Sequence, residues 1–540
     1  MKTVLVLGGY GGFGARLSIR LAADGWSVLV AGRNEEAARR FAETLPNARP
    51  VRADRNGDLR PILQMHRPTL VIDAAGPFQG SDYRVAETCI ACGTHYIDLA
   101  DARDFVTGIA ALDERARKAG VVVLAGASSV PAMSGAIITE LSADMDVVNR
   151  VSMAISGSNR ATAGASVAAA ILSYVGRPVR IWRGRHWRQE TGWHWLKRVH
   201  YRVEGRPDMS RLVALSDVPD HEIVPSRVTG RPATMFRAGP EFSFQLLVLW
   251  LLSWPVKWGW WTSLSPLARW LLPLQKLTAG LGTDRSAMMV EIKGQKGDVF
   301  LARRWTLIAE EGHGPEIPTM AAQLLARSIL EGTLASRARS AAQALSFSDF
   351  TPLLDDLATF RQIDTENYLP VYRRVMGATY QALPQPVRHM HDVFGDAGAE
   401  GLATVTRGRS MLAQLVATIM SFPPEGEHRL HVSFEEEGGV ERWTRDFAGH
   451  VFVSELSRSG RHLVERFGPM RFYFDLPSDE TGLTMIMRKW SLLRVPMPLF
   501  LAPKSVAREW AEGDDFWFDV PIALPLIGDV VHYRGWLRRL

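Results

Sequence analysis

A glycine cluster placed directly after the first strand-forming run constrains the fold more than any other feature of the sequence. Residues 4–7 are an unbroken apolar run, and residues 9–14 read Gly-Tyr-Gly-Gly-Phe-Gly. A helical pattern follows over residues 15–23, with Leu17 and Leu21 on one face. A strand, a glycine turn and a helix in this order predict the opening of a parallel α/β sheet whose first turn holds a dinucleotide.

The spacing of three of these glycines gives each a separate physical role. Gly9 permits a tight turn, Gly11 lets the backbone approach a pyrophosphate, and Gly14 allows the helix to pack closely against the strand. The free N–H groups and the partial positive charge of the helix N-terminus then face the phosphates. A flexible turn without a ligand is the alternative for the bare motif. We predict that the cofactor is bound by Gly9, Tyr10, Gly11, Gly12, Phe13 and Gly14.

The end of the second predicted strand indicates which dinucleotide fits. Residues 27–31 form this strand, and Gly32, Arg33 and Asn34 follow it. An enzyme that uses NAD usually has an Asp or Glu here for the ribose 2′-hydroxyl, whereas an arginine suits the 2′-phosphate of NADP. We therefore predict NADP(H) with Arg33 as the phosphate ligand. An exposed loop arginine without a ligand is the alternative.

Strands alternate with helices up to residue 125, which predicts a doubly wound parallel sheet with its ligand at the carboxyl ends of the strands. Asp54 follows the third strand and is predicted at the adenine end of the cofactor. The fourth predicted strand, residues 70–75, ends at Ala75, and Gly76 and Pro77 follow it; these three residues are predicted beside the nicotinamide.

Hydride transfer needs one group that manages the proton of the substrate. The candidates near the nicotinamide are Tyr96, Asp98, Asp101 and Ser129, and of these we predict Asp98 and Tyr96 as catalytic. A helix cap is the alternative role for Asp98. His95 alternates with Tyr96 along the fifth strand, so one of the two side chains faces away from the cleft.

The length and net charge of the chain limit the number of domains and the kinds of binding partner. With 540 residues, of which 46% are hydrophobic, the chain can form about three domains. Its net charge of +6 gives no indication of nucleic-acid binding. The densest basic stretch, residues 177–188, suits phosphate or anionic lipid, but we favour a solvated edge strand.

The sequence predicts no metal site. Cys89 and Cys92 form a single C-x-x-C pattern without a second pair of ligands, so we interpret them as small buried side chains of a helix. His389 and His391 are two residues apart on a predicted helix and therefore point in different directions. This cysteine usage fits a reducing cytosol, and no signal peptide is predicted before the first strand.

One apolar block interrupts the second domain. It comprises residues 242–254, Trp258, Trp260, Trp261 and residues 264–274. Pro255 and Lys257 interrupt it, so it falls short of the ~20 residues that a membrane-spanning helix needs. Crowded tryptophans beside basic residues suit a segment in a membrane interface. A substrate lid or a dimer contact is an equally weighted alternative.

From residue 428 the pattern changes to strands separated by glycine-bearing turns. The predicted strands are residues 428–436, 440–447, 450–457, 462–467, 470–476, 483–493, 515–524 and 529–537. Sequential antiparallel strands predict an up-and-down meander that closes as a small barrel or forms a cupped sheet. A barrel of this size can hold one small apolar ligand.

Three motifs of the first domain resemble the NADP-binding domain of the saccharopine dehydrogenase-like family. They are residues 8–14, residues 75–78 (Ala-Gly-Pro-Phe) and residues 91–98 (Ala-Cys-Gly-Thr-His-Tyr-Ile-Asp). Residues 128–134 look like the family's link to a second domain, and residues 314–319 look like the return to the first. The resemblance implies an active site in the cleft between these domains. Strands at residues 150–156, 286–293 and 299–310 predict a mixed α+β second domain.

The resemblance is closer to the poorly characterised oxidoreductases and trans-acting enoyl reductases of this family than to its saccharopine enzymes. We find no arginine set in the second domain that matches the binding of two amino-acid carboxylates, and the tryptophan-rich block favours an apolar substrate. The C-terminal part resembles a domain of unknown function, DUF4166, through residues 441–447, 465–468, 496–498 and 533–537. This second resemblance implies no chemistry. Trp443, Arg445, Glu465 and Arg466 either line a pocket or pair across strands.

Together these features predict a Rossmann domain at residues 1–130, an α+β substrate or dimerisation domain at 131–346, and an antiparallel barrel-like domain at 367–540. The predicted function is NADP-dependent hydride transfer to or from a small, lipidic or carrier-bound substrate with an enoyl, keto or imine group. The alternatives are a non-catalytic NADP(H) sensor or scaffold and a lipid-binding protein that acts through its C-terminal domain. We expect a cytoplasmic protein, peripheral on the inner face of the membrane if residues 242–274 contact lipid, and a homodimer if they form a subunit contact.

Overall fold

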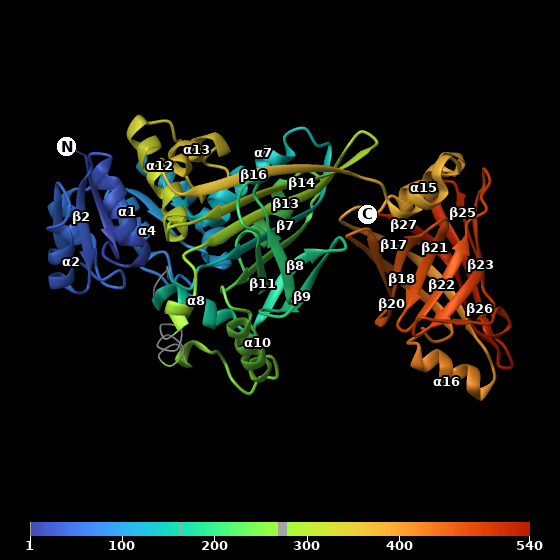
Figure 1. Ribbon diagram of the computed structural model, residues 1–540. Helices are drawn as coiled ribbons and strands as arrows, with labels where there is room; N and C mark the ends of the chain where they lie inside the picture. The colour runs from blue at the N-terminus through green and yellow to red at the C-terminus, as the bar shows by residue number, and fades with distance from the viewer. Residues whose placement is uncertain (1, 161–164, 268–269, 271–277) are drawn as a thin grey trace.

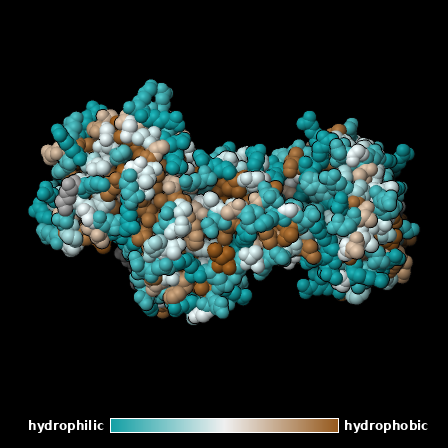
Figure 2. All heavy atoms as spheres, turned by 90° about the horizontal axis from the view of Figure 1, so that it is seen from above, coloured by the Kyte–Doolittle hydropathy of each residue, from teal (hydrophilic) through white to brown (hydrophobic). Residues whose placement is uncertain are grey.

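The computed structural model describes residues 2–160, 165–267, 270 and 278–540. A parallel sheet, a mixed sheet and a barrel follow one another along the length of the molecule (Figure 1). The molecule narrows to a waist where the barrel joins the rest (Figure 2).

The first domain is built on a parallel sheet of seven strands in the order β15-β6-β5-β4-β1-β2-β3. The strands are β1 Thr3–Leu7, β2 Ser27–Gly32, β3 Ala48–Arg52, β4 Leu70–Asp73, β5 His95–Asp98, β6 Val123–Ala125 and β15 Ala338–Ser340. The helices are α1 Gly12–Ala23, α2 Glu35–Ala42, α3 Arg60–His66, α4 Arg84–Ala91, α5 Arg103–Gly108, α6 Asp113–Ala119 and α12 Ile317–Glu331. The sheet has the Rossmann strand order, which confirms the predicted fold.

Alternation along the strands explains why helices are needed on both faces. In β1, Val4 and Val6 belong to one buried cluster, whereas Leu5 and Leu7 belong to another. A strand that is apolar on both faces is typical of a parallel sheet covered on each side. The strand order reverses between β4 and β1, and a ligand binds at such a switch point.

The second domain contains a mixed sheet of seven strands in the order β10-β11-β12-β7-β13-β14-β16. The strands are β7 Val147–Ser156, β10 Lys197–Tyr201, β11 Met209–Leu215, β12 Ala233–Gly239, β13 Ser286–Lys296, β14 Val299–Ala309 and β16 Thr359–Tyr368. The helices are α7 Ser134–Ser142, α8 Ala165–Tyr174, α9 Asp220–Arg227, α10 Ser243–Lys257 and α13 Phe347–Asp355. This mixed sheet confirms the predicted α+β character.

The chain returns to the first domain before it enters the barrel. In α12, Arg327 pairs with Asp24 at the end of α1 at 2.7 Å, and Glu316, just before α12, pairs with Arg20 at 2.9 Å. Residues 337–366, most of which lie between the second and third predicted domains or at the end of the second, contain β15, α13 and most of β16. They therefore contribute strands to both sheets, so they are structural rather than a linker.

The C-terminal domain is a closed antiparallel barrel. Ten of the eleven strands in its sheet, all but β24, form a ring that the pairing of β22 with β23 closes. The strands are β17 Asp396–Arg407, β18 Gly426–Glu437, β19 Val440–Phe447, β20 His450–Ser459, β21 His462–Phe467, β22 Met470–Asp475, β23 Gly482–Leu492, β24 Val495–Met497, β25 Val506–Glu512, β26 Asp515–Leu524 and β27 Gly528–Arg539. Short helices are α14 Val371–Met376, α15 Gln385–His391 and α16 Met411–Ile419. The predicted barrel is confirmed, but the sequence missed β17 and β25 of the ring and the short β24.

The basic stretch at residues 177–188 has a different role from the predicted solvated edge. It forms a hairpin of β8 Pro178–Arg183 and β9 His186–Thr191 that contacts the barrel. Arg183 pairs with Glu435, and the N–H of Gly184 donates a hydrogen bond to Asp396 at 2.8 Å. Behind the hairpin, Lys293 forms a buried ion pair with Glu436 at 2.7 Å. These charges therefore join two domains.

Candidate functional site

A cleft of about 770 Å³ lies between the first and second domains. Its walls come from the carboxyl ends of β1 to β5 on one side and from α8, β12, β13 and β14 on the other. One end contains the glycine turn and Arg33, and the other end contains Asp101, Tyr174 and apolar side chains. One cleft therefore connects the predicted dinucleotide-binding residues to a space in which a substrate could bind.

The glycine turn has the local structure that a pyrophosphate requires. The N–H of Gly11 donates a hydrogen bond to the carbonyl of Gly8 at 2.9 Å, and α1 begins at the next residue. Gly11 offers no side-chain cap, and no acidic residue lies in the first turn of α1. The helix N-terminus thus keeps free N–H donors and a positive potential toward the cleft. The residues present fit a dinucleotide.

Gly14 is required by the packing of α1 against the turn. A Cβ atom at Gly14 would lie 2.1 Å from the carbonyl oxygen of Gly8. We expect Gly14→Ala to destabilise the protein by more than about 2 kcal/mol, because the helix must move away from the strand. Thermal unfolding measures the loss. Gly157→Ala is the control, since a Cβ there has no neighbour within 4 Å; equal stability of the two variants would contradict the packing role.

Tyr10 and Arg33 lie at the end of the cleft that is predicted to hold the adenosine. The ring of Tyr10 packs against Gly32 so closely that a Cβ atom at Gly32 would lie 2.4 Å from the ring. The hydroxyl group of Tyr10 accepts a hydrogen bond from the N–H of Asn34 at 3.0 Å. These contacts position the loop after β2. Arg33 is exposed and lines the cleft, and it is not part of any ion pair with a described residue. Its guanidinium is therefore available to a phosphate.

The predicted cofactor residues fall into two groups. Tyr10, Gly11, Gly12, Phe13, Arg33, Asp54, Ala75, Gly76 and Pro77 line the cleft. Gly9 and Gly14 lie behind the turn, where they permit its close packing. Asp54 accepts a hydrogen bond from the N–H of Asn56 at 3.0 Å and so also shapes its own loop.

An ion pair that the sequence did not predict fixes the loop that is predicted to lie beside the nicotinamide. Arg55 pairs with Asp73 at 2.9 Å, and its guanidinium lies 4.8 Å from the ring centre of Phe78. Burial raises the pKa of Asp73, and Arg55 counteracts part of that rise. Asp73 also accepts a hydrogen bond from the N–H of Ala75 at 3.0 Å. The pair thereby holds Ala75, Gly76 and Pro77 at the cleft.

The two residues predicted as catalytic do not line the cleft. Tyr96 is fully buried among the side chains of the first domain, and His95 uses its Nδ1 to accept a hydrogen bond from the N–H of Val122. Asp98 is also fully buried, and one of its oxygens accepts hydrogen bonds from the N–H groups of Ala100 and Gly126. Asp98 therefore joins the loops after β5 and β6. This role is structural, but it is not the helix cap given as the alternative, because α5 begins after Ala102 without a side-chain cap.

Burial raises the pKa of Asp98 to about 7, from an ordinary value of 3.8. The folded protein therefore holds the proton more tightly than the unfolded chain, so Asp98 lowers the free energy of unfolding progressively as pH rises from about 4 to about 7. We expect Asp98→Asn to gain stability relative to the wild type over this range, by a few kcal/mol in total. Urea unfolding at several pH values measures the difference. A pH-independent difference would contradict the raised pKa.

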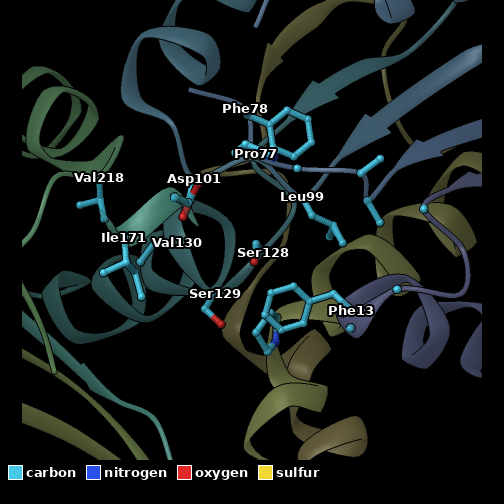
Figure 3. Close-up of a pocket in the computed structure, with 18 of the residues that line it drawn as sticks. Phe13, Pro77, Phe78, Leu99, Asp101, Ser128, Ser129, Val130, Ile171 and Val218 are labelled. Atoms are coloured by element: carbon cyan, nitrogen blue, oxygen red, sulfur yellow. The ribbon is translucent and has the colours of Figure 1, made fainter. Parts of the chain in front are cut away.

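Asp101, by contrast, lies at the substrate end of the cleft. Figure 3 shows its carboxyl group in the neighbourhood of Pro77, Val130, Ile171 and Val218. Gln79 donates a hydrogen bond to Asp101 at 3.1 Å. Burial raises the pKa of Asp101, and the hydrogen bond from Gln79 counteracts part of that rise. The site thus contains an acid whose neutral form is favoured more than in water.

Tyr174 comes from α8 of the second domain and faces the same space. Burial raises the pKa of its hydroxyl, and the charge of Asp101 adds to this rise, so the two groups interact electrostatically. Tyr174 therefore stays protonated and can donate a hydrogen bond. Neither Tyr174 nor Gln79 belongs to a motif, and only Gln79 is adjacent to one, at the end of residues 75–78.

The rest of the substrate end is mostly apolar. Its side chains include Val130, Ile155, Ile171, Val218, Phe236, Met288 and Leu307. The charged exception is Asp217, which pairs with Arg103 at 2.5 Å and lies 3.4 Å from Nδ1 of His221. Because these two partners come from α5 and α9, Asp217 is committed to joining the two domains. The arrangement suits an apolar substrate with one polar group near Asp101 and Tyr174.

Among the described residues, one group brings together side chains that could bind a metal ion. His186, Glu400 and His431 have ligand atoms within 4.8 Å of one another at the contact between the hairpin and the barrel. His186 already pairs with Glu400 at 2.8 Å, and Nε2 of His431 lies 2.9 Å from the carbonyl of Gly184. These contacts account for the group as part of the interdomain contact.

The sheet, its switch point and the glycine turn define the first domain as a nicotinamide dinucleotide-binding domain. Residues 4–124 match the model of the Saccharopine dehydrogenase NADP binding domain, and residues 383–537 match that of the Domain of unknown function (DUF4166). The parallel-sheet domain is therefore similar to saccharopine dehydrogenase-type NADP-binding domains, and the barrel is similar to DUF4166 domains. Both predicted resemblances are confirmed. No curated protein matches the chain.

Solved structures show limited likeness. The putative oxidoreductase yvaA from Bacillus subtilis has 13% identity over 65% of this chain and 96% of its own, with a TM-score of 0.29. GenD2 from gentamicin A biosynthesis, in complex with NAD, has 13% identity over 68% of this chain and 96% of its own, with a TM-score of 0.32. A short-chain dehydrogenase from Sphingobium yanoikuyae, in complex with NADPH, has 19% identity over 23% of this chain and 70% of its own, with a TM-score of 0.20.

Proposed function

We propose that the protein is an NADP(H)-dependent oxidoreductase that moves a hydride between the nicotinamide and a carbon atom of an apolar substrate. The observation that carries this proposal is a single cleft that joins the glycine turn and Arg33 to a largely apolar space containing Asp101 and Tyr174. The glycine turn and the N-terminus of α1 would hold the pyrophosphate, and Arg33 would hold the 2′-phosphate.

We assign the proton step to Asp101 because it lines the cleft, whereas Asp98 and Tyr96 do not. When bound, the nicotinamide supplies or accepts the hydride. In the reductive direction, Asp101 in its neutral form would donate a proton to the atom next to the carbon that receives the hydride. Tyr174 would orient the polar group of the substrate by a hydrogen bond, and solvent would return the proton to Asp101. In the oxidative direction the carboxylate would accept the proton.

The substrate class follows from the walls of the cleft. Apolar side chains surround Asp101 and exclude water from the reacting atoms, which strengthens the interactions of a polar group there. An enoyl, keto or imine group on a lipidic or carrier-bound chain meets these requirements, since each needs one hydride and one proton for reduction. The proposal is tested by NADPH oxidation in the presence of a medium-chain enoyl thioester, a methyl ketone and a cyclic imine.

The result that supports the proposal is NADPH oxidation with at least one of these substrates and transfer of deuterium from deuterated NADPH to a carbon of the product. Tight NADPH binding without oxidation by any of the three would instead favour the non-catalytic sensor.

A further inference from the structure

Large apolar side chains are exposed at one end of the barrel. We call this surface the apolar rim and define it by Met411, Leu415 and Ile419 on α16, Leu499 and Phe500 between β24 and β25, and Leu526 between β26 and β27. The strand register places these connections at the same end. Arg407, just before α16, pairs with Val531 near the start of β27, and Lys504 bridges to Ala523 near the end of β26.

Helix α16 illustrates the unusual exposure of the rim. Its small residues Ala413 and Ala417 pack into the barrel core, whereas Met411 and Ile419 are 87% and 72% exposed. Phe500, on a neighbouring loop, is 76% exposed. A helix on a solvent-exposed surface normally has polar residues on its outer face. Contiguous apolar side chains on the outer face of α16 therefore mark a contact surface.

A second exposed apolar surface lies on the substrate domain. We call it the tryptophan patch and define it by Phe244 and Leu251 on α10 and by Trp258, Trp260 and Trp261 after it. These residues belong to the block at 242–274, for which a membrane contact and a substrate lid or dimer contact were equally weighted predictions. Residues 268–269 and 271–274 of that block lie outside the described residues.

The inner face of α10 connects the patch to the cleft. Leu246 and Val256 of α10 pack with Leu172 of α8 and with Val175, which directly follows α8. Helix α8 presents Ile171 and Tyr174 to the cleft. The tryptophan patch is therefore only one helix layer away from the substrate end of the site.

Helices that carry parts of the two surfaces lie on the same side of the molecule. Helices α10 and α16 both lie along the lower edge of the molecule in Figure 1. The upper face, seen in Figure 2, intersperses apolar and polar side chains. The contact between the two domains fixes this arrangement through the buried pair of Lys293 with Glu436 and the hydrogen bond from Gly184 to Asp396.

We propose that the apolar rim and the tryptophan patch dock together on the surface of a phospholipid bilayer. A bilayer is flat and extended, so it can contact two separate domains at once, and tryptophan is the side chain most suited to its interface. No helix of the described residues has the length and apolar character needed to cross a membrane, so the contact lies in the interface. The proposal gives the DUF4166 domain the role of a second membrane contact.

The charged residues around these surfaces indicate how strongly binding depends on the charge of the lipid. Lys257 lies over the ring of Trp254 at 4.6 Å, and Arg494 and Lys504 are exposed beside the rim. Glu425 and Asp529 are exposed at the same end of the barrel and offset the cations. We therefore expect binding that depends mainly on apolar insertion and only weakly on anionic lipid.

The test is flotation of the full chain with vesicles of phosphatidylcholine that contain about a fifth phosphatidylglycerol. One variant combines Leu499→Asp and Phe500→Asp in the rim, and another combines Leu251→Asp and Trp260→Asp in the patch. Because two contacts on one rigid body bind cooperatively, each variant should bind at least ~10-fold more weakly, and the combination of all four changes should remove flotation. Ile363→Asp is the control, since Ile363 is 48% exposed on β16 at the upper edge of Figure 1.

Two results would overturn the proposal. The first is wild-type protein that does not float with the vesicles. If sedimentation then shows that the rim variants disrupt a dimer, the rim is a subunit contact instead. The second is a rim variant that floats as well as the wild type. NADPH binding and circular dichroism of each variant show that it is folded. Since neither surface contacts the dinucleotide end of the cleft, failure here is separable from failure of the proposed oxidoreductase activity.

Discussion

Asp101→Asn is expected to lower kcat by about 10²–10⁴-fold and to leave the dissociation constant for NADPH nearly unchanged. Asparagine has the same shape and can still accept the hydrogen bond that Gln79 donates to Asp101 at 3.1 Å. It cannot donate or accept the proton that accompanies hydride transfer. The measurement is steady-state NADPH oxidation with a substrate that the wild type reduces, together with calorimetric titration of NADPH.

The pH profile separates a proton donor from a merely structural residue. Burial raises the pKa of Asp101, so reduction by the wild type should slow as pH rises through that pKa and the carboxyl group loses its proton. The asparagine variant should lack this limb of the profile. Asp104→Asn is the matched control, because Asp104 is exposed and does not line the cleft. Wild-type turnover in Asp101→Asn would remove Asp101 from the mechanism.

Arg33→Glu is expected to weaken NADPH binding by about 100-fold and to change NADH binding far less. The substitution replaces a cation, which can bind the 2′-phosphate through two hydrogen bonds, with an anion that repels it. NADH has no phosphate at this position. The ratio of the two dissociation constants, measured by calorimetry, is therefore the readout.

Arg40→Glu is the control for this change of charge. Its side chain is 70% exposed on the outer face of α2, where it pairs with Glu36 at 3.8 Å. The control should keep the wild-type preference for NADPH. An unchanged ratio in Arg33→Glu would show that Arg33 does not contact the 2′-phosphate, and the choice of NADP over NAD would then lose its basis.

The dinucleotide end of the site could be predicted from the sequence because its determinants are local. The strand, the turn and the helix at residues 4–23 are consecutive, and Arg33 follows the next strand directly. The positions of these residues relative to the predicted cofactor phosphates depend only on the turn that directly follows each strand. The substrate end is different, because Tyr174 and the apolar wall reach it from the second domain, and no short pattern marks them.

Asp98 and Tyr96 show a second limit of sequence reasoning. Their place at the end of β5 was predicted correctly, but the direction of their side chains depends on neighbours that are distant in the chain. Asp98 turns toward the N–H of Gly126, and Tyr96 fills the core of the first domain. Asp101 was one of four candidates, and it differs from Asp98 because it lines the cleft, whereas Asp98 is held by N–H groups within the first domain.

Strand β17, one of the barrel strands that the sequence missed, is poor in strand-forming residues for a structural reason. β17 contains Gly398 and Gly401, and a Cβ at Gly401 would lie 1.8 Å from the carbonyl of Trp536 in β27. The strand therefore uses glycine to let its neighbour approach, which lowers its apparent strand propensity. Arg445 and Glu465, whose role was open, form a pair at 3.6 Å within the barrel.

The most direct test of the central claim is calorimetric titration of the wild-type chain with NADPH and with NADH. We predict one binding site, a micromolar dissociation constant for NADPH and a weaker one for NADH by at least ~10-fold. Absence of heat with both dinucleotides at millimolar concentration would contradict the claim that this cleft binds a nicotinamide cofactor.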